Sequence, residues 1–250
     1  MTEPIPVRPA ATVLLVRDGM TGLEVFMVVR HHKIDFASGA LVFPGGSVDA
    51  GDYAIAADPT LCGPATGLDE RNRASRVAAV RETFEECGVL LARPRGSEEG
   101  LDVRIGAQSR GRPFGEFIIA ENLELALDAL TPFAHWITPP ILPKRFDTHF
   151  YIVAAPSDQI AIHDGLESVD SVWINPARAL AEADAGKYTL VFATRLNLQM
   201  LAQSPDPVSA MAAARVRRIV TVEPVAVKTE SGYTMRIPIE AGYGAGVFEV

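Results

Sequence analysis

The stretch RETFEECGV, from Arg81 to Val89, contains an unusual crowd of like charges. It places Glu82, Glu85 and Glu86 within five residues of an otherwise apolar segment. A helix turns about 100° per residue, so the three carboxylates fall on one face, within an arc of about 100°. Like charges at this spacing destabilise a helix by roughly a few tenths of a kcal/mol per pair, and only Arg81 lies at the edge of the cluster to offset this. We therefore expect a further cation against this face.

The opposite face of the same helix is apolar. It carries Val77, Val80, Phe84 and Cys87. A stripe of this kind packs on a sheet, so the segment is predicted to have a buried side and an anionic side. The helical pattern runs from about Asp69 to Cys87, and Gly88 stands where a helix C-cap is expected.

The carboxylate face suits a divalent metal ion. Carboxylate oxygens on a rigid helix are ligands that Mg²⁺ or Mn²⁺ prefers, and these ions keep waters that substrate oxygens can replace. Most acidic runs are solvated surfaces, however, so the residues alone leave a metal site and a solvated face both open. An acidic helix at a protein interface is a third alternative, but it gives no reason for the glycine turn upstream at residues 45–46.

The other segments predict a mixture of strands and helices. Two apolar runs, residues 10–18 and 23–30, flank GMTG and indicate a β-hairpin. A short strand at ALVF, from residue 40, stops at Pro44. Further strands are predicted at 149–156 and 168–175, helices at 176–186 and 192–203, and a C-terminal hairpin within 218–239 with its turn at ESGY. Strands and helices do not alternate regularly, so the predicted fold class is α+β.

Composition and charge narrow the compatible functions. The 250 residues are 48% hydrophobic, as in ordinary folded proteins, and the net charge is -8. An acidic chain is a poor ligand for nucleic-acid phosphates or for an anionic membrane surface. No apolar run reaches the roughly 18 residues of a membrane span, and the first residues do not form an export signal. We expect a cytoplasmic protein that binds a small molecule, with no nucleic-acid or membrane partner.

RETFEECGV resembles the second half of the Nudix hydrolase motif. That half reads Arg-Glu, an apolar residue, any residue, Glu-Glu, any residue, Gly and an apolar residue, and the sequence departs from it only at Thr83. The first half, Gly followed by five residues and Glu, is matched in FPGGSVDAGD by Gly46 and Asp52, with Asp in place of Glu. Gly67 also has the regular spacing to the second half, but Arg73 then occupies the acidic position, so Gly46 is the preferred assignment.

Residues 53–80 separate the two halves, where the family has seven residues. A long insertion here, together with WITPPILPKRFDTHFYIVA and residues 165–202, is similar to the peroxisomal-type coenzyme A diphosphatases and their bacterial relatives. The resemblance runs from about residue 10 to residue 203. It implies an α/β/α sandwich with a mixed sheet and a catalytic helix. We expect a Nudix domain at 1–205, whose insertion at about 53–75 is a surface excursion, and a β-hairpin extension at 206–250 packed on the same domain.

The resemblance also implies roles for the motif residues. Glu85 and Glu86 would bind Mg²⁺ or Mn²⁺, and Glu82 would bind metal or hold the attacking water. Arg81 would orient a glutamate through paired hydrogen bonds from its planar guanidinium group.

Residues outside the helix complete the expected site. The carbonyl of Gly45 or Gly46 would add a ligand, with Gly46 assigned to the metal and Gly45 to the substrate. Lys144 and Arg145 begin a strand and are candidates for binding a substrate phosphate, Arg145 being preferred because it can bind phosphate bidentately. A basic strand end in water is an equally good interpretation of the pair.

A loop acid outside the motif often serves the family as metal ligand or general base. Glu167 is the first candidate and Asp164 the second, although either could be a solvated loop residue. The aromatic residues and histidines carry weaker signals. Phe146 and Phe150 are expected in the core, and His135 lacks the close helical spacing of a zinc pair.

Two classes of function follow. The first is Mg²⁺- or Mn²⁺-dependent hydrolysis of a diphosphate, with coenzyme A or acyl-coenzyme A as the preferred substrate and ADP-ribose, nucleotide sugars or dinucleotides as alternatives. The second is a non-enzymatic Nudix domain that senses a nucleotide, although such domains usually lose the glutamates that are present here. Many relatives are homodimers, and the sequence leaves that assembly open.

Overall fold

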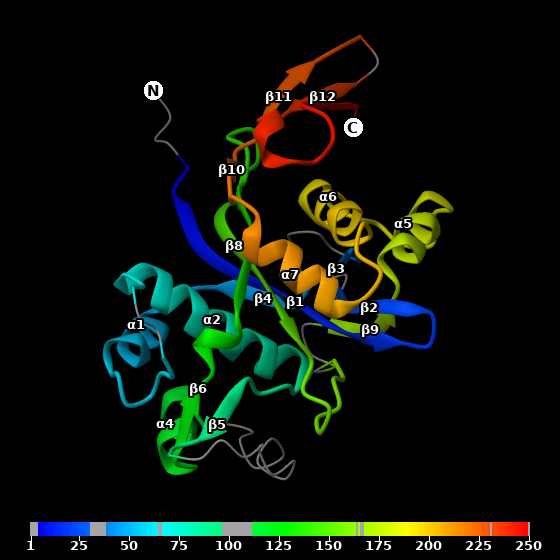
Figure 1. Cartoon of the computed structure of the whole chain (residues 1–250). Helices are drawn as coiled ribbons and strands as arrows, with labels where there is room; N and C mark the ends of the chain where they lie inside the picture. The colour runs from blue at the N-terminus through cyan, green and yellow to red at the C-terminus, as the bar shows by residue number, and fades with distance from the viewer. Residues whose placement is uncertain are drawn as a thin grey trace.

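The computed structural model describes residues 5–30, 39–64, 67–96, 112–163, 165, 168–230 and 232–249. Its main feature is an eight-stranded mixed sheet built around β1 (Val7–Gly19) (Figure 1). β1 is antiparallel to β2 (Gly22–Arg30) and β4 (Gly45–Ser47) and parallel to β8 (Arg145–Ala154). β2 also pairs with β3 (Leu41–Val42) and β9 (Ser168–Ile174), and beyond β8 follow β7 (Thr131–Ile137) and β10 (Thr221–Val222). The predicted β1–β2 hairpin is confirmed.

Side chains that alternate along β1 enter two separate cores. Val13 and Leu15 pack on one face, Leu14 and Val16 pack on the other, and all four are fully buried. The first face is covered by α1 (Ala50–Ala57), α2 (Glu70–Cys87) and α4 (Phe114–Ala120). The second is covered by α5 (Pro176–Asp184), α6 (Phe192–Leu201) and α7 (Pro207–Val216). Figure 1 shows the two groups of helices on opposite sides of the sheet, so the expected α/β/α sandwich is confirmed.

The helix that carries the glutamates, α2, begins and ends where its caps predict. The side chain of Asp69 accepts a hydrogen bond from the backbone N–H of Asn72, and Gly88 ends the helix with a φ of 72°. The predicted apolar stripe is buried against the sheet, as Val77, Val80, Phe84 and Cys87 are at most 9% exposed. Thr83, at the motif position where an apolar residue is usual, is fully buried and donates its hydroxyl to the Ala79 carbonyl.

The insertion is not the surface excursion that we expected. It forms α1 and the following turn, and it places Ile55, Ala56, Leu61 and Cys62 in the core at no more than 8% exposure. α1 packs against α2. The expectation was wrong because it weighed only the small entropic cost of a longer loop, whereas the apolar side chains of this segment stabilise the fold when they are buried.

The C-terminal residues contribute to more than a hairpin. β11 (Val225–Lys228) and β12 (Tyr233–Arg236) form the predicted hairpin, and β13 (Val247–Glu249) adds a third strand that pairs with β12. This small sheet projects at one end of the molecule (Figure 1). α7 and β10 instead join the main core and the main sheet. The boundary at residue 205 stays a prediction.

Two short strands and a 3-10 turn lie near α4, and a second such turn lies near the C-terminus. β5 (Ala92–Pro94) pairs with β6 (Leu123–Leu125), which is followed by the 3-10 turn η1 (Leu127–Ala129), and a second such turn, η2 (Ile239–Ala241), precedes β13. Among the helices that the structure describes, none is long and apolar enough to cross a bilayer.

Candidate active site

α2 presents its three glutamates at three different depths. The side chain of Glu85 is 49% exposed and that of Glu82 is 14% exposed. Glu86 is 5% exposed as a whole residue, and its Oε2 accepts a hydrogen bond of 2.9 Å from the backbone N–H of Gly45. A solvated acidic face would expose all three side chains, so the cluster is part of an organised site.

Arg81 is the hub of this site. Its Nη1 lies 2.8 Å from Glu82 Oε1 and 2.9 Å from Glu85 Oε2. Its Nη2 donates to the carbonyl of Ser47 at 2.9 Å, which ties the helix to the turn that contains the two glycines. Arg81 thus makes one hydrogen bond to each of two glutamates, and not the expected paired bonds to one of them; its orienting role stays a prediction.

Asp52 holds the other side of the same guanidinium group. Its two oxygens accept from Nε and Nη2 of Arg81, both at 2.8 Å, and Asp52 is fully buried. Its Oδ2 also accepts from the backbone N–H of Asp49, the N-cap of α1, whose side chain in turn accepts from the backbone N–H of Asp52. Asp in place of the usual Glu therefore still reaches the arginine, because α1 brings its backbone close to α2.

The two glycines are required by close approach. A Cβ at Gly46 would lie 2.4 Å from the Glu82 carboxyl carbon, and one at Gly45 would lie 2.4 Å from the backbone oxygen of Ala11. Gly46 therefore leaves the space that the Glu82 carboxylate occupies. Gly67, by contrast, precedes the N-cap of α2, about 20 Å along the helix from Glu82, so it is not part of this site.

Burial changes the proton affinity of the site. It raises the pKa of Glu82 to about 7 against the opposing charge of Arg81, and it raises the pKa of Glu85 in the same direction. Burial lowers the pKa of Arg81, but the hydrogen bonds to Asp52 and the charge of Glu82 outweigh it and raise that pKa above its ordinary value, so Arg81 stays charged. Burial disfavours the charged form of these carboxylates, and they share one arginine. A divalent cation bound beside them would therefore stabilise their charged form.

The carboxylates open into a cavity of about 580 Å³. Its acidic end is lined by Glu82, Glu85, Arg81 and the glycine turn, and Thr12 and Thr148 also line it. The rest of the wall is mainly apolar. That wall includes Trp136, Leu142, Phe146, Phe150, Phe192 and Met235. Such a volume is within the range of small-molecule sites, about 300–1,000 Å³.

Of the site residues predicted outside the motif, the structure describes Arg145 and Lys144. Arg145 donates from Nε to the Thr138 carbonyl at 2.9 Å and pairs with Glu223 at 2.5 Å, so its fork already has protein partners. Lys144 is exposed, and neither residue is among the described residues that line the cavity. Glu167 and Asp164 lie outside the described residues.

Some cavity residues were not expected from the sequence. Phe146, expected in the core, lines the cavity instead, while Phe150 belongs both to the core and to the wall. Arg30, at the end of β2, also lines the cavity. A charge at the end of an apolar strand was the only signal for Arg30.

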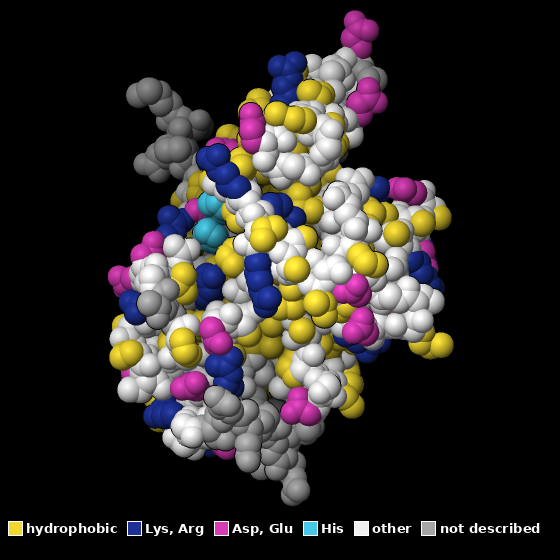
Figure 2. All heavy atoms as spheres, viewed as in Figure 1, with side chains coloured by type: hydrophobic (Ala, Val, Ile, Leu, Met, Phe, Trp, Pro, Cys, Tyr) yellow, Lys and Arg dark blue, Asp and Glu magenta, His cyan; other side chains and the backbone are white. Residues whose placement is uncertain are grey.

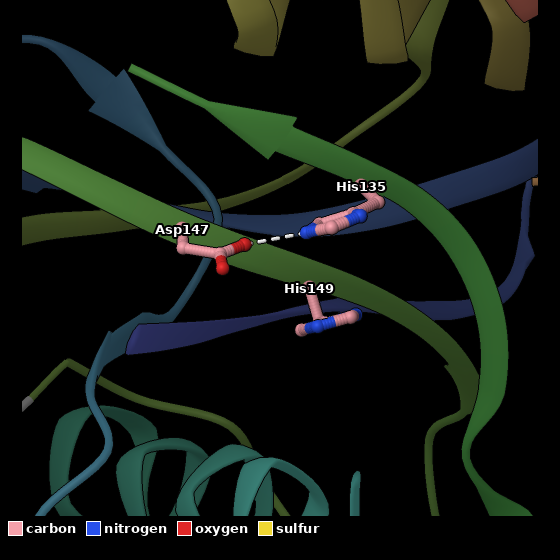
Figure 3. A group of neighbouring side chains, drawn as sticks. All are labelled: His135, Asp147 and His149. Carbon is pink, nitrogen blue, oxygen red and sulfur yellow. Dashed lines mark hydrogen bonds and ion pairs between the residues drawn. The ribbon is translucent and has the colours of Figure 1, made fainter. Parts of the chain in front are cut away.

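A second cluster of possible metal ligands lies on another part of the sheet. His135 of β7 is the cross-strand partner of His149 of β8, and their side chains lie with that of Asp147 in Figure 3. Asp147 and His149 alternate along β8 with the cavity residues Phe146 and Thr148, so they point to the other face. Figure 2 shows histidine side chains at the surface beside Lys and Arg.

The geometry of this cluster favours an ion-pair network over a metal site. The two imidazole rings stack 4.2 Å apart at 7°, so one ion cannot lie in both ring planes, where the nitrogen lone pairs point. His135 Nε2 is 2.5 Å from Asp147 Oδ1, and Asp147 also pairs with Arg71 of α2. Burial, with the charge of His135, lowers the pKa of His149 to about 4, so this ring is neutral at pH 7.

Comparisons with known proteins agree with the motif and the fold. A family model described as the NUDT19 Nudix domain matches residues 70–190. The chain is 30% identical to putative nudix hydrolase 7 of Caenorhabditis elegans, over 80% of this chain and 62% of that protein. It is 29% identical to human acyl-coenzyme A diphosphatase NUDT19, over 63% of this chain and 55% of that protein. The chain thus spans between half and two thirds of the length of these curated relatives.

A solved structure extends the agreement to three dimensions. The crystal structure of a Nudix hydrolase from Alicyclobacillus acidocaldarius aligns with a TM-score of 0.72 and 28% identity, covering 83% of this chain and 96% of that one. The match therefore covers most of this chain and nearly all of that structure. The motif, the fold and the comparisons thus agree on a likeness to the Nudix hydrolase superfamily, with similarity to its coenzyme A diphosphatase-like subgroup.

Proposed function

We propose that the protein hydrolyses a diphosphate linkage, with Mg²⁺ or Mn²⁺ bound by Glu82, Glu85 and Glu86. The observation that carries this proposal is the opening of the Glu82 and Glu85 carboxylates into a cavity beside the glycine turn. A diphosphate is anionic, so bare carboxylates would repel it. Bound Mg²⁺ or Mn²⁺ would neutralise the diphosphate oxygens and make a nearby water more acidic.

The side chains of the site have distinct tasks in this proposal. The side chain of Glu82 is 14% exposed and lines the acidic end of the cavity, where its carboxylate would bind the metal or hold the attacking water. Arg81 holds Glu82 and Glu85 in place from one nitrogen, and Asp52 fixes Arg81 from the opposite side. The backbone N–H of Gly45 holds Glu86.

Coenzyme A or acyl-coenzyme A is the proposed substrate, with 3',5'-ADP and phosphopantetheine or its acyl derivative as products. The apolar part of the cavity supports the acyl-coenzyme A choice, because an acyl chain is apolar and is stabilised by contact with apolar side chains. Trp136, Phe192 and Met235 supply part of the apolar wall. The printed name of the human relative, an acyl-coenzyme A diphosphatase, supports the same choice. ADP-ribose, nucleotide sugars and dinucleotides are the alternative substrates.

Purified protein should be incubated with Mg²⁺ or Mn²⁺ and coenzyme A, acetyl-coenzyme A, ADP-ribose, NADH or a nucleotide sugar, with products followed by chromatography. Glu85→Gln should abolish turnover because it removes a proposed metal ligand. Glu70→Gln is the matched control, since Glu70 is an exposed residue in the first turn of the same helix. It should retain full activity.

The result separates the function classes. Release of 3',5'-ADP from coenzyme A, lost in Glu85→Gln, supports both the chemistry and the substrate. Cleavage of another compound in the panel keeps the hydrolase and rejects the coenzyme A assignment. No turnover of any compound, with metal present, favours a nucleotide-binding protein without catalysis.

A further inference from the structure

Arg30, at the end of β2, lines the same cavity as the carboxylates of Glu82 and Glu85. Along β2, Val28 packs in the core beneath α2, whereas Val29 packs against the core on the other face. The pairing of β2 with β9 shifts register between Val29 and Arg30, so Arg30 stands at a local irregularity of the strand. Val42 of the neighbouring strand β3, the cross-strand partner of Val28, lines the same cavity as Arg30.

The backbone of Arg30 is fixed, whereas its charge is not engaged. The backbone N–H of Arg30 donates to the Ala40 carbonyl at 3.1 Å, and its carbonyl accepts from the backbone N–H of Gly39 at 3.2 Å. The Nε of Arg30 is buried without a hydrogen-bond partner. Within the described part of the chain, no carboxylate lies within ion-pair distance of its guanidinium group.

The other ionisable side chains that line the cavity are already coupled to each other. They are Arg81, Glu82 and Glu85. Arg81 has no spare capacity because Asp52, Ser47 and the two glutamates use its nitrogens. Among the described residues that line this cavity, Arg30 is therefore the arginine that offers an entering anionic ligand an unused donor.

We propose that Arg30 binds the diphosphate of the substrate and positions it beside the carboxylates of α2. The inference rests on the proposed function for the identity of the ligand. A guanidinium group suits this task because its planar fork can donate two parallel hydrogen bonds to one phosphate. In this arrangement the substrate supplies the hydrogen-bond acceptor that the buried Nε lacks in the free protein.

Binding of methylene diphosphonate, a diphosphate that cannot be hydrolysed, tests the proposal independently of turnover. Its dissociation constant should be measured by calorimetry in the presence of Mg²⁺ for the wild type, Arg30→Met and Arg30→Lys. Arg30→Met should weaken binding roughly 10- to 100-fold, which is the range for losing charge-assisted hydrogen bonds. Arg30→Lys keeps the charge but lacks the planar fork, so its dissociation constant should lie between those of the wild type and Arg30→Met. It also tests the proposal if Arg30→Met fails to fold.

The melting temperature gives a second readout that a purely structural residue would not produce. Removing an unsatisfied buried donor should leave the Tm of the free protein unchanged or raise it, while the rise in Tm caused by methylene diphosphonate should shrink. Arg17→Met is the matched control. Arg17 pairs with Glu24 and stacks on Trp173 outside the cavity, so its loss should lower Tm and leave diphosphonate binding unchanged.

The outcomes distinguish this inference from the proposed function. Equal diphosphonate affinity in wild type and Arg30→Met, or no binding by the wild type, overturns the role of Arg30 even if coenzyme A is hydrolysed. Binding that depends on Arg30 in a protein that hydrolyses nothing keeps the role of Arg30 and rejects the hydrolase. A Tm of the free Arg30→Met variant well below that of the wild type would also overturn the inference, because Arg30 would then be structural.

Discussion

Replacing Asp52 by Asn should destabilise the protein by about 2–3 kcal/mol, because it removes the charge that fixes Arg81. Asp52 is fully buried, and its two oxygens each accept from Arg81 at 2.8 Å. Asn can accept with only one oxygen, and its amide group would then point at an N–H donor. The perturbation is small in shape, so its effect reports on charge and hydrogen bonding and not on packing.

The magnitude follows from the partners that remain. Breaking a buried ion pair from one side costs about 3–5 kcal/mol. Arg81 keeps part of this stabilisation, because Ser47, Glu82 and Glu85 still accept from it and its side chain is 11% exposed. One retained hydrogen bond from Asn further reduces the loss, which leads to the lower figure of about 2–3 kcal/mol.

Urea unfolding followed by far-ultraviolet circular dichroism measures this effect, with Asp49→Asn as the control. The side chain of Asp49 is 59% exposed and lies 3.9 Å from Arg81, and Asn caps a helix as well as Asp does. Asp49→Asn should therefore cost less than about 1 kcal/mol. If Asp52→Asn costs no more than Asp49→Asn at an unchanged denaturant slope, the account of Asp52 as the anchor of Arg81 is refuted.

Four further predictions follow from the same contacts. Asp52→Glu restores the residue usual in the superfamily but adds a methylene to a fully buried site, so the free energy of unfolding in urea should fall by about 1–3 kcal/mol. Gly46→Ala should displace the flexible Glu82 carboxylate and lower turnover about 100-fold, in the substrate assay, with little change in unfolding. Phe84→Ala, which removes a ring from the core beneath α2, should cost about 3–5 kcal/mol in urea unfolding. Burial lowers the pKa of His149 from 6.5 to about 4, so its protonation favours the unfolded state. The stability that the neutral ring contributes is complete above pH 6.5 and is lost as the pH falls towards 4, and His149→Asn should therefore flatten this part of the curve of unfolding free energy against pH.

Each of these predictions can fail in a specific way. A more stable Asp52→Glu would show that the site has room for the longer acid. Full activity of Gly46→Ala would mean that the position of Glu82 does not matter for turnover. A loss below about 1 kcal/mol in Phe84→Ala would show that the site can collapse after truncation. If the free energy of unfolding changed with pH equally in the wild type and in His149→Asn between pH 4 and 6.5, His149 would not contribute to the acid sensitivity of the protein.

Local signals predicted the part of the structure that carries the motif. Asp69 and Gly88 mark the ends of α2 through cap chemistry, and the glycines between the first two strands mark their hairpin. Such signals act within a few residues, so they are readable without the fold. β7 was missed because Pro132 interrupts its pattern, and the register shift between Pro132 and Ala134 is what accommodates that proline in the sheet.

The parts of the site that were not predicted depend on residues distant in the chain. Glu223 pairs with Arg145 and occupies the fork that had been assigned to a phosphate. The contact of His135 with His149 needs the register of two strands. Arg30 is a candidate binding residue only because it lines the cavity, and that cavity is formed by residues from the start of the chain to Met235. Sequence spacing cannot report pairings of this kind.

The parallel pairing of β1 with β8 sets a waiting time during synthesis. Val7 to Val16 pair with Arg145 to Ala154, so the central strand cannot complete its ladder until the chain beyond residue 154 has left the ribosome. At about 5–20 residues per second, this delay is roughly 7–30 s. In that interval β1 can pair with β2 and β4 but not with β8, and much of its apolar surface is open to other nascent chains. Codon choice and chaperone access along the first half of the message would therefore influence the yield of folded protein more than the same changes in the second half.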